Sequence, residues 1–313
     1  MSTEADMTLS RDGMAEILVP ASIANLGPGF DTLAVALQLF LRLRVRAESS
    51  SGLRFDFVGR SLQGENYIER AFRFLARQNG MEVPSLSVEV HSDIPMRSGL
   101  GSSAAATVAG IRLYETVFGR IPPQAALNVA CILEGHPDNA AAALFGGLTG
   151  SCQLPDSSVY AMSFPWPECL QAIVVTPEYE LQTSVSRGVL PQRISQRDAV
   201  FNLQRVVLLM HALQNNDFTL LKEALRDRWH QPFRQRLVPG LEQALGIDHP
   251  DVLGVCLCGA GPSVAAFAKS NFEEVEQLMH EVFMQAGVEY RVRRLQVQQP
   301  APMPYSFPVL TSI

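Results

Sequence analysis

A glycine- and serine-rich turn lies within residues 94–110, IPMRSGLGSSAAATVAG, and has the residue types that bind phosphate without a basic side chain. Alternating residues before the turn predict a strand that ends at Val90, and the alanine-rich stretch after it predicts a helix from about Ser103. The start of such a helix presents free backbone N–H groups and a positive dipole end, which together bind anions. Gly99 and Gly101 would let the backbone approach an oxygen that a Cβ would exclude. Taken alone, the segment also fits a capped core helix.

Two other phosphate-binding motifs fit the turn less well. A Walker A loop needs a lysine before Ser or Thr, and this stretch has none. A Rossmann fingerprint is met only loosely by Gly99, Gly101 and Ala104, and the next acid, Glu115, falls inside the same predicted helix. Dinucleotide binding is therefore the weaker interpretation.

Length and composition exclude several classes of protein. A chain of 313 residues with 47% hydrophobic and 18% charged residues is typical of a globular protein, with two domains as the expectation and one large α/β domain as the alternative. The net charge of −6, with scattered Lys and Arg, predicts no binding to nucleic acid or to an anionic membrane surface. The cysteines and histidines lack the spacing of a zinc site, and the chain shows neither a basic signal-peptide start nor an apolar run of about 20 residues. We expect a reduced, cytoplasmic protein with no membrane span.

Hydrophobic periodicity predicts the elements that must position the turn. The expected strands cover residues 15–24, 39–48, 86–90, a stretch from 147, and residues 171–177, 252–259, 263–268 and 288–297. The expected helices cover residues 66–80, a stretch from 103, and residues 125–135, 199–214, 221–227 and 272–287. In the helix at 199–214 the apolar spacing falls on Val200, Leu203, Val207 and Met210. Prolines and serines at 154–167 predict the domain junction, and the element order after it fits a split β-α-β sandwich.

Three further stretches carry a family resemblance. They are VPASIANLGPGFDTLAVAL (19–37), EGHPDNAAAALFGG (134–147) and CGAGPSVAAF (258–267). Together with PMRSGLGSSAAA they resemble, in order, the motifs of the GHMP kinases, named for galactokinase, homoserine kinase, mevalonate kinase and phosphomevalonate kinase. The resemblance is closest to the homoserine kinases, because ANLGPGFD, the short form of EGHPDN, TSVSRGVLP and QPFRQRLVPG are similar to segments of that group.

The resemblance implies a two-domain α+β fold. Residues 1–160 would form an N-terminal α/β domain with a left-handed β-α-β crossover and the phosphate loop. Residues 161–313 would form a C-terminal ferredoxin-like sandwich. The implied reaction is ATP-dependent phosphorylation of the side-chain hydroxyl of L-homoserine to O-phospho-L-homoserine, on the route to threonine. Relatives are commonly homodimers, so a homodimer is expected.

The resemblance also implies where ATP and its metal bind. The expected ATP- and phosphate-binding residues are Pro95, Arg97, Ser98, Gly99, Leu100, Gly101, Ser102, Ser103, Ala104 and Asn66. Asn66 stands, with Tyr67 and Ile68, where the family contacts adenine, although the segment also reads as a plain amphipathic helix. Ser103 and Glu134 would hold Mg²⁺, a hard ion that prefers oxygen ligands, with Ser102 as the alternative to Ser103.

The expected substrate site is built for a zwitterion with a hydroxyl. Asp31, beside Asn25, would bind the ammonium group, and Arg187 and Arg234 would bind the carboxylate through arginine's planar fork. The remaining substrate-binding residues are Thr183, in the segment of Arg187, and Asn139.

Catalysis would rest on two of these residues. Asn139 would orient the hydroxyl and Arg187 would help to stabilise the γ-phosphate, with no general base and with His136 assigned to structure. Asn139 with Asp138 can also be read as a helix N-cap after Pro137. The alternatives in function are a sibling kinase, a non-enzymatic GHMP-fold binding protein and, last, a nicotinamide dehydrogenase.

Overall fold

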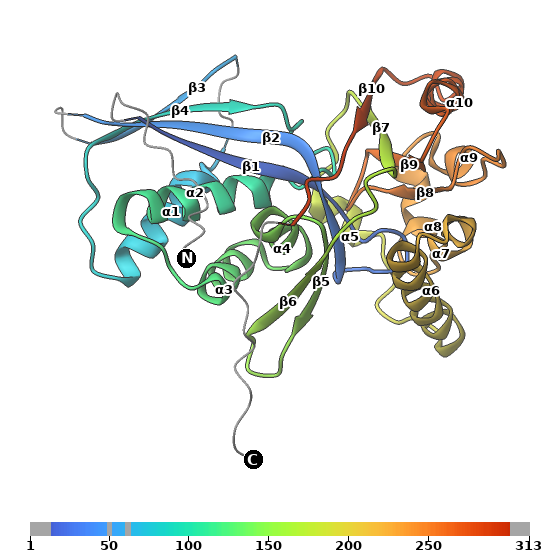
Figure 1. Ribbon diagram of the computed structural model, residues 1–313, viewed down its shortest axis with the longest axis horizontal. Coiled ribbons are helices and arrows are strands. Elements are labelled where there is room, and N and C mark those ends of the chain that lie inside the picture. The colour runs from blue at the N-terminus through green and yellow to red at the C-terminus, as the bar shows by residue number, and fades with distance from the viewer. Residues whose placement is uncertain (1–13, 49–51, 60–63, 301–313) are drawn as a thin grey trace.

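The computed structural model describes residues 14–48, 52–59 and 64–300, which form two sheets with their helices (Figure 1). Within these residues the first sheet has the order β3-β4-β2-β5-β6, with β1 paired to β2. Its strands are β1 (Met14–Ala24), β2 (Leu33–Ala47), β3 (Leu53–Phe57), β4 (Leu86–Ser92), β5 (Leu148–Gln153) and β6 (Val159–Phe164). Its helices are α1 (Tyr67–Gln78), α2 (Ser102–Phe118), α3 (Pro123–Glu134) and α4 (Asp138–Phe145). The β-α-β unit that the family resemblance predicts is β3-α1-β4, because β3 and β4 pair in parallel.

The second sheet has the order β10-β7-β9-β8, and the pairs along it are antiparallel. Its strands are β7 (Gln171–Pro177), β8 (Gly254–Leu257), β9 (Val264–Ala268) and β10 (Tyr290–Leu295). The helices of this half are α5 (Thr183–Gly188), α6 (Gln196–Asn215), α7 (Leu221–Ala224), α8 (Gln231–Arg234), α9 (Leu241–Leu245) and α10 (Phe272–Gln285). The expected ferredoxin-like order of strands and helices is therefore confirmed.

The proline- and serine-rich stretch at 154–167 was expected to join the domains, but it contains β6. This strand pairs antiparallel with β5, so it extends the first sheet. The prolines and all the serines except Ser163 lie in the turn before the strand and in the segment after it. The predicted boundary between residues 160 and 161 falls inside β6 and stays a prediction.

Periodicity located α6 correctly, but of the four residues that carry the apolar spacing only Met210 packs against the core. Val200, Leu203 and Val207 are 43%, 67% and 70% exposed. The face that packs contains Leu209 and Leu213, which are almost fully buried. No helix in the part of the chain that the structure describes has the length and apolar character needed to cross a membrane.

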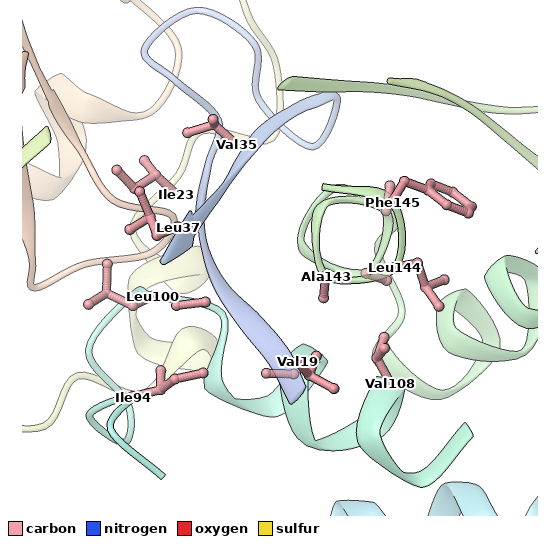
Figure 2. Close-up of a cluster of buried hydrophobic side chains, with 14 of the residues drawn as sticks. Val19, Ile23, Val35, Leu37, Ile94, Leu100, Val108, Ala143, Leu144 and Phe145 are labelled. Atoms are coloured by element: carbon pink, nitrogen blue, oxygen red, sulfur yellow. The ribbon is translucent and has the colours of Figure 1, made fainter. Parts of the chain in front are cut away.

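The loop between β4 and α2 is anchored in the hydrophobic core at both of its ends. Ile94 and Leu100 are 0% exposed and belong to the same buried cluster as Ile23 and Leu37. Figure 2 shows Ile94 and Leu100 turned toward that cluster. Burying each such side chain contributes about 1.5–3 kcal/mol, so the two residues fix in place the loop that carries Gly99 between them and Gly101 directly after Leu100.

Candidate active site

A cleft of about 510 Å³ lies between the two halves and collects most of the expected site residues. The expected residues that line it are Asn25, Asp31, Asn66, Arg97, Ser98, Gly99, Gly101, Ser102, Ser103, Asn139, Thr183, Arg187 and Arg234. The other expected residues are not among those lining the cleft, and they are Pro95, Leu100, Ala104 and Glu134. Leu100 and Ala104 are almost fully buried, so any contact of theirs with ATP would have to use the backbone.

The phosphate loop needs glycine at two positions. Gly101 is the N-cap of α2 at φ 70°, and a Cβ there would lie 2.2 Å from the Ser22 hydroxyl. Gly99 has φ +83°, and a Cβ there would lie 2.2 Å from the carbonyl oxygen of Cys258. No side chain caps α2, so the N–H groups of its first turn stay available beside Ser102 and Ser103.

The turn at residues 259–263, GAGPS, holds the phosphate loop and the substrate loops together. The Asn25 amide donates to the carbonyl of its first residue at 3.0 Å, and the Ser186 hydroxyl donates to that of its second at 2.6 Å. The backbone N–H of its last residue donates to the carbonyl of Ser98 at 3.0 Å. These contacts join the turn to the loop of Asn25, to helix α5 and to the loop before α2.

Ser103 and Glu134, which are expected to hold Mg²⁺, are in direct contact. The Ser103 hydroxyl donates to Glu134 Oε2 at 2.7 Å, and the Thr107 hydroxyl donates to Oε1 at 2.5 Å. Sequence analysis missed Thr107, although its position four residues after Ser103 on one helix face was the available signal. The structure shows no hydrogen bond from Ser102 to this carboxylate among the contacts of the described residues.

The side-chain amide of Asn139 has a defined orientation. The Ser22 hydroxyl donates to Asn139 Oδ1 at 2.7 Å, and the amide NH₂ group donates to Asp138 Oδ1 at 3.4 Å. The NH₂ group has two hydrogens, so one of them stays available to a group in the cleft. The N-cap interpretation is wrong, because the N-cap of α4 is Pro137 and it makes no side-chain capping hydrogen bond. Helix α4 begins at Asp138, and the Asp138 carboxylate accepts the backbone N–H of Asn139 at 2.7 Å.

His136 has a carboxylate partner that sequence analysis did not identify. Its Nδ1 lies 2.8 Å from Oδ1 of Asp138, which is 2% exposed, and both residues line the cleft. Burial lowers the pKa of His136, but the hydrogen bond and charge of Asp138 outweigh this effect, so the pKa is raised overall. The spacing of the two residues in EGHPDN was the available signal.

Asp31 and Arg187 form a two-point ion pair in the cleft. Arg187 Nη1 lies 3.0 Å from Asp31 Oδ2, and Nη2 lies 2.6 Å from Oδ1. Hydrogen bonding to Asp31 raises the pKa of Arg187. The side chains are 38% and 34% exposed, so the pair contributes little to stability and can be exchanged for other partners.

Arg234 is a buried cation whose hydrogen-bond acceptors are all neutral. It is 1% exposed, and it donates to the carbonyls of Ser186 and Gly259 at 3.3 and 2.9 Å and to His230 Nδ1 at 3.1 Å. The ion pairs of the described residues include none with Arg234. Burial and the charge of Arg187 lower the pKa of Arg234 to about 10, so it remains charged at neutral pH.

Phe30 brings the two arginines to one place. Its ring centroid lies 5.4 Å from the Arg187 guanidinium carbon and 5.6 Å from that of Arg234. Sequence analysis passed over Phe30, although it stands inside ANLGPGFD, directly before Asp31. Arginine stacks favourably on aromatic rings, so Phe30 stabilises both guanidinium groups at the cleft.

The side chain of Asn66 caps the N-terminus of helix α1. As its N-cap, Asn66 accepts the backbone N–H groups of Ile68 and Glu69 through Oδ1. Asn66, Tyr67 and Ile68 also line the cleft, so the expected contact with adenine stays a prediction.

Comparison with known proteins agrees with this geometry. Residues 66–147 match the family model described as GHMP kinases N terminal domain, and residues 209–283 match the one described as GHMP kinases C terminal. A homoserine kinase from Solibacter usitatus is 38% identical over 275 residues, covering 86% of this chain and 90% of that protein. The chain therefore belongs to the GHMP kinase family.

Two further relatives of this chain are also homoserine kinases. A homoserine kinase from Moorella thermoacetica is 38% identical over 287 residues, covering 90% of this chain and 97% of that protein. The crystal structure of homoserine kinase from Cytophaga hutchinsonii is similar with a TM-score of 0.81 and 27% identity, over 93% of this chain and 96% of that one.

Proposed function

We propose that the protein is a homoserine kinase, which transfers the γ-phosphoryl group of ATP to the side-chain hydroxyl of L-homoserine and forms O-phospho-L-homoserine for threonine synthesis. One observation carries the choice of an amino-acid substrate. Arg234 is a buried charge with only neutral partners, and it lies with Arg187 beside Asp31. Buried charges are normally paired, so an incoming carboxylate would complete this site.

The charges of a zwitterion match the cleft. The ammonium group of homoserine would bind Asp31 beside Asn25, and its carboxylate would bind Arg187 and Arg234. The substrate would thereby exchange the Asp31–Arg187 ion pair for two ion pairs of its own. Thr183, on the same helix α5 as Arg187, also lines the cleft and would complete the site.

ATP would occupy the end of the cleft beside α2. The free N–H groups of the first turn and the helix dipole would bind its phosphates, with Gly99 and Gly101 allowing close approach. Ser103 and Glu134 fit Mg²⁺, because both offer oxygen ligands at this end of the helix and they already lie 2.7 Å apart. When bound, Mg²⁺ would neutralise charge on the phosphates.

The proposed reaction is a direct displacement. The hydroxyl oxygen of homoserine forms the new bond to the γ-phosphorus while the bond to the β-phosphate oxygen breaks, and ADP leaves. The NH₂ group of Asn139, held by Ser22, would donate to the hydroxyl oxygen and direct its lone pair at phosphorus. Arg187 would stabilise charge on the transferred group, and the hydroxyl proton would pass to phosphate or solvent.

A coupled ADP-release assay tests the proposal with Mg·ATP and L-homoserine, beside L-threonine, L-serine and mevalonate. We expect turnover on homoserine, and a large increase in KM for homoserine in Arg234→Ala with KM for ATP unchanged. Turnover on mevalonate alone, or no turnover despite ATP binding, would refute the proposed function.

A cytoplasmic location, a homodimer and Mg²⁺ itself stay predictions. Sedimentation velocity would test the dimer. Loss of turnover in EDTA, restored by excess Mg²⁺, would test the metal.

A further inference from the structure

His230 is a fully buried histidine whose two ring nitrogens face groups with fixed hydrogen-bonding roles. Its Nε2 lies 2.7 Å from the carbonyl oxygen of Gly27 and 3.5 Å from Asp227 Oδ2, both of which can only accept a hydrogen bond. Its Nδ1 lies 3.1 Å from Arg234 Nη1, which can only donate. Nε2 must therefore carry the proton and Nδ1 must be bare, so the ring is neutral.

The surroundings agree with a neutral ring. Burial lowers the pKa of His230, and the nearby charge of Arg234 acts in the same direction, while Asp227 opposes both. Asp227 uses its carboxylate mainly on the backbone, where it accepts the N–H groups of Trp229, His230 and Gln231 at 2.8, 2.8 and 2.7 Å. These bonds fix the main chain on both sides of His230.

The two partners of His230 belong to two different parts of the substrate site. Gly27 lies in the loop that carries Asn25 and Asp31, which would bind the ammonium group. Arg234 would bind the carboxylate. Phe30, from the same loop as Gly27, lies against the imidazole with ring centroids 5.4 Å apart.

We propose that His230 is a positioning residue for recognition of the substrate carboxylate, because it joins the ammonium-binding loop to Arg234 and supplies the acceptor that holds Arg234. The inference rests on the proposed function. The other hydrogen bonds of Arg234 go to two backbone carbonyls, so among the described residues Nδ1 of His230 is its one side-chain acceptor. Without Nδ1 the guanidinium would lose one of its fixed contacts and its orientation toward the cleft.

Two substitutions separate the two hydrogen bonds of the ring. In His230→Asn, the amide oxygen can stand near the position of Nδ1, which keeps an acceptor for Arg234 and removes the donor to Gly27. In His230→Gln, the longer amide can reach the position of Nε2, which keeps a donor to Gly27 and removes the acceptor for Arg234. Both variants are polar and uncharged.

The measured quantity is the ratio of kcat/KM for L-homoserine to that for 3-aminopropan-1-ol, which lacks the carboxylate. We expect His230→Gln to lower this ratio at least tenfold, toward the value in Arg234→Ala, while His230→Asn keeps it within about threefold of the original protein. KM for ATP should stay unchanged in both variants. A melting curve of each variant shows how much folded protein enters the assay.

The outcomes decide between a positioning role and a merely structural one. A fall in the ratio for Gln with retention for Asn supports the proposal. An equal fall in both variants, or an unchanged ratio in His230→Gln, overturns it. If the unsubstituted protein does not phosphorylate homoserine at all, the proposed function fails first and this inference fails with it.

Discussion

Replacing Ser22 by alanine should slow the proposed reaction more than it weakens substrate binding. The Ser22 hydroxyl donates to Asn139 Oδ1 at 2.7 Å, and Ser22 is 0% exposed, so water cannot replace it from the solvent side. This bond decides which end of the Asn139 amide faces the cleft. Without it the amide can invert, and the group offered to the reacting hydroxyl changes from a donor to an acceptor.

The size of the effect follows from the lost hydrogen bond. Leaving a fully buried acceptor unpaired costs about 1–3 kcal/mol, and Asn139 is only partly buried, so this range is an upper limit. It corresponds to a fall in kcat of at most about 5- to 150-fold if the inverted amide is inactive. KM for homoserine should change by less than about threefold, because the expected ammonium and carboxylate partners are untouched.

Steady-state kinetics of Ser22→Ala, with Thr149→Val as the control, would measure this. Thr149 is also 0% exposed, and its hydroxyl donates to the carbonyl of Ala34 at 3.3 Å, so Thr149→Val removes a buried hydroxyl that does not contact Asn139. If Ser22 acts through Asn139, then Ser22→Ala should have almost no effect on kcat in an Asn139→Ala background. An equal fall in kcat with and without Asn139 would refute the reasoning.

Other consequences of the geometry can be measured separately. Gly99→Ala should abolish ATP-dependent turnover or folding, because its Cβ would lie 2.2 Å from the Cys258 carbonyl oxygen; unchanged KM for ATP would contradict this. On α6, Leu209→Ala should lower the free energy of unfolding by about 2–5 kcal/mol, whereas Leu203→Gln, at a position 67% exposed, should change it by less than about 0.5 kcal/mol. Burial lowers the pKa of His230 in the folded protein, whereas in the unfolded chain this histidine has its ordinary pKa of 6.5. Below pH 6.5 the unfolded chain therefore binds a proton at this position that the folded protein does not, so the free energy of unfolding falls as pH falls. The stability difference between the original protein and His230→Asn, from urea unfolding at pH 7.5 and 5.5, should therefore shift in favour of the variant at pH 5.5.

Local patterns in the sequence predicted the elements that bury one clear face. The alternation in β2 is confirmed, since Leu41, Leu43 and Val45 are at most 5% exposed. Helix α1 is also confirmed, with Asn66 as its N-cap. In such segments the residues that carry the hydrophobic period are also the residues that pack, so the sequence alone predicts both the element and its buried face.

Local patterns were insufficient where the packing partner is distant in the sequence. Strand β6 looked like a linker because only its pairing with β5 makes it a strand. Helix α6 carries apolar residues on more than one face, and periodicity cannot say which face meets the core. The packed face is set by contacts with other elements, which a window of one helix does not contain.

The same limit applies inside the site. The contiguous motifs identified residues that line the cleft, but not the side chains that orient them. Ser22 and Asn139 are 117 residues apart, and His230 and Gly27 are 203 apart, so no spacing rule joins them. His136 and Asp138 are only two residues apart, so their spacing in EGHPDN was enough to predict this pair.

The charges of the cleft connect substrate recognition with phosphoryl transfer. Among the side chains expected to bind the charged groups of the substrate, Asp31, Arg187 and Arg234 carry one excess positive charge. Asp138 also lines the cleft, and its charge acts on both arginines without an ion pair to Arg234. A protein carboxylate in an ion pair with Arg234 would stabilise the folded chain, but it would also compete with the carboxylate of the substrate. Homoserine, as a zwitterion, adds no net charge, so the charge of the two arginines can still act on the negative γ-phosphate when homoserine is bound.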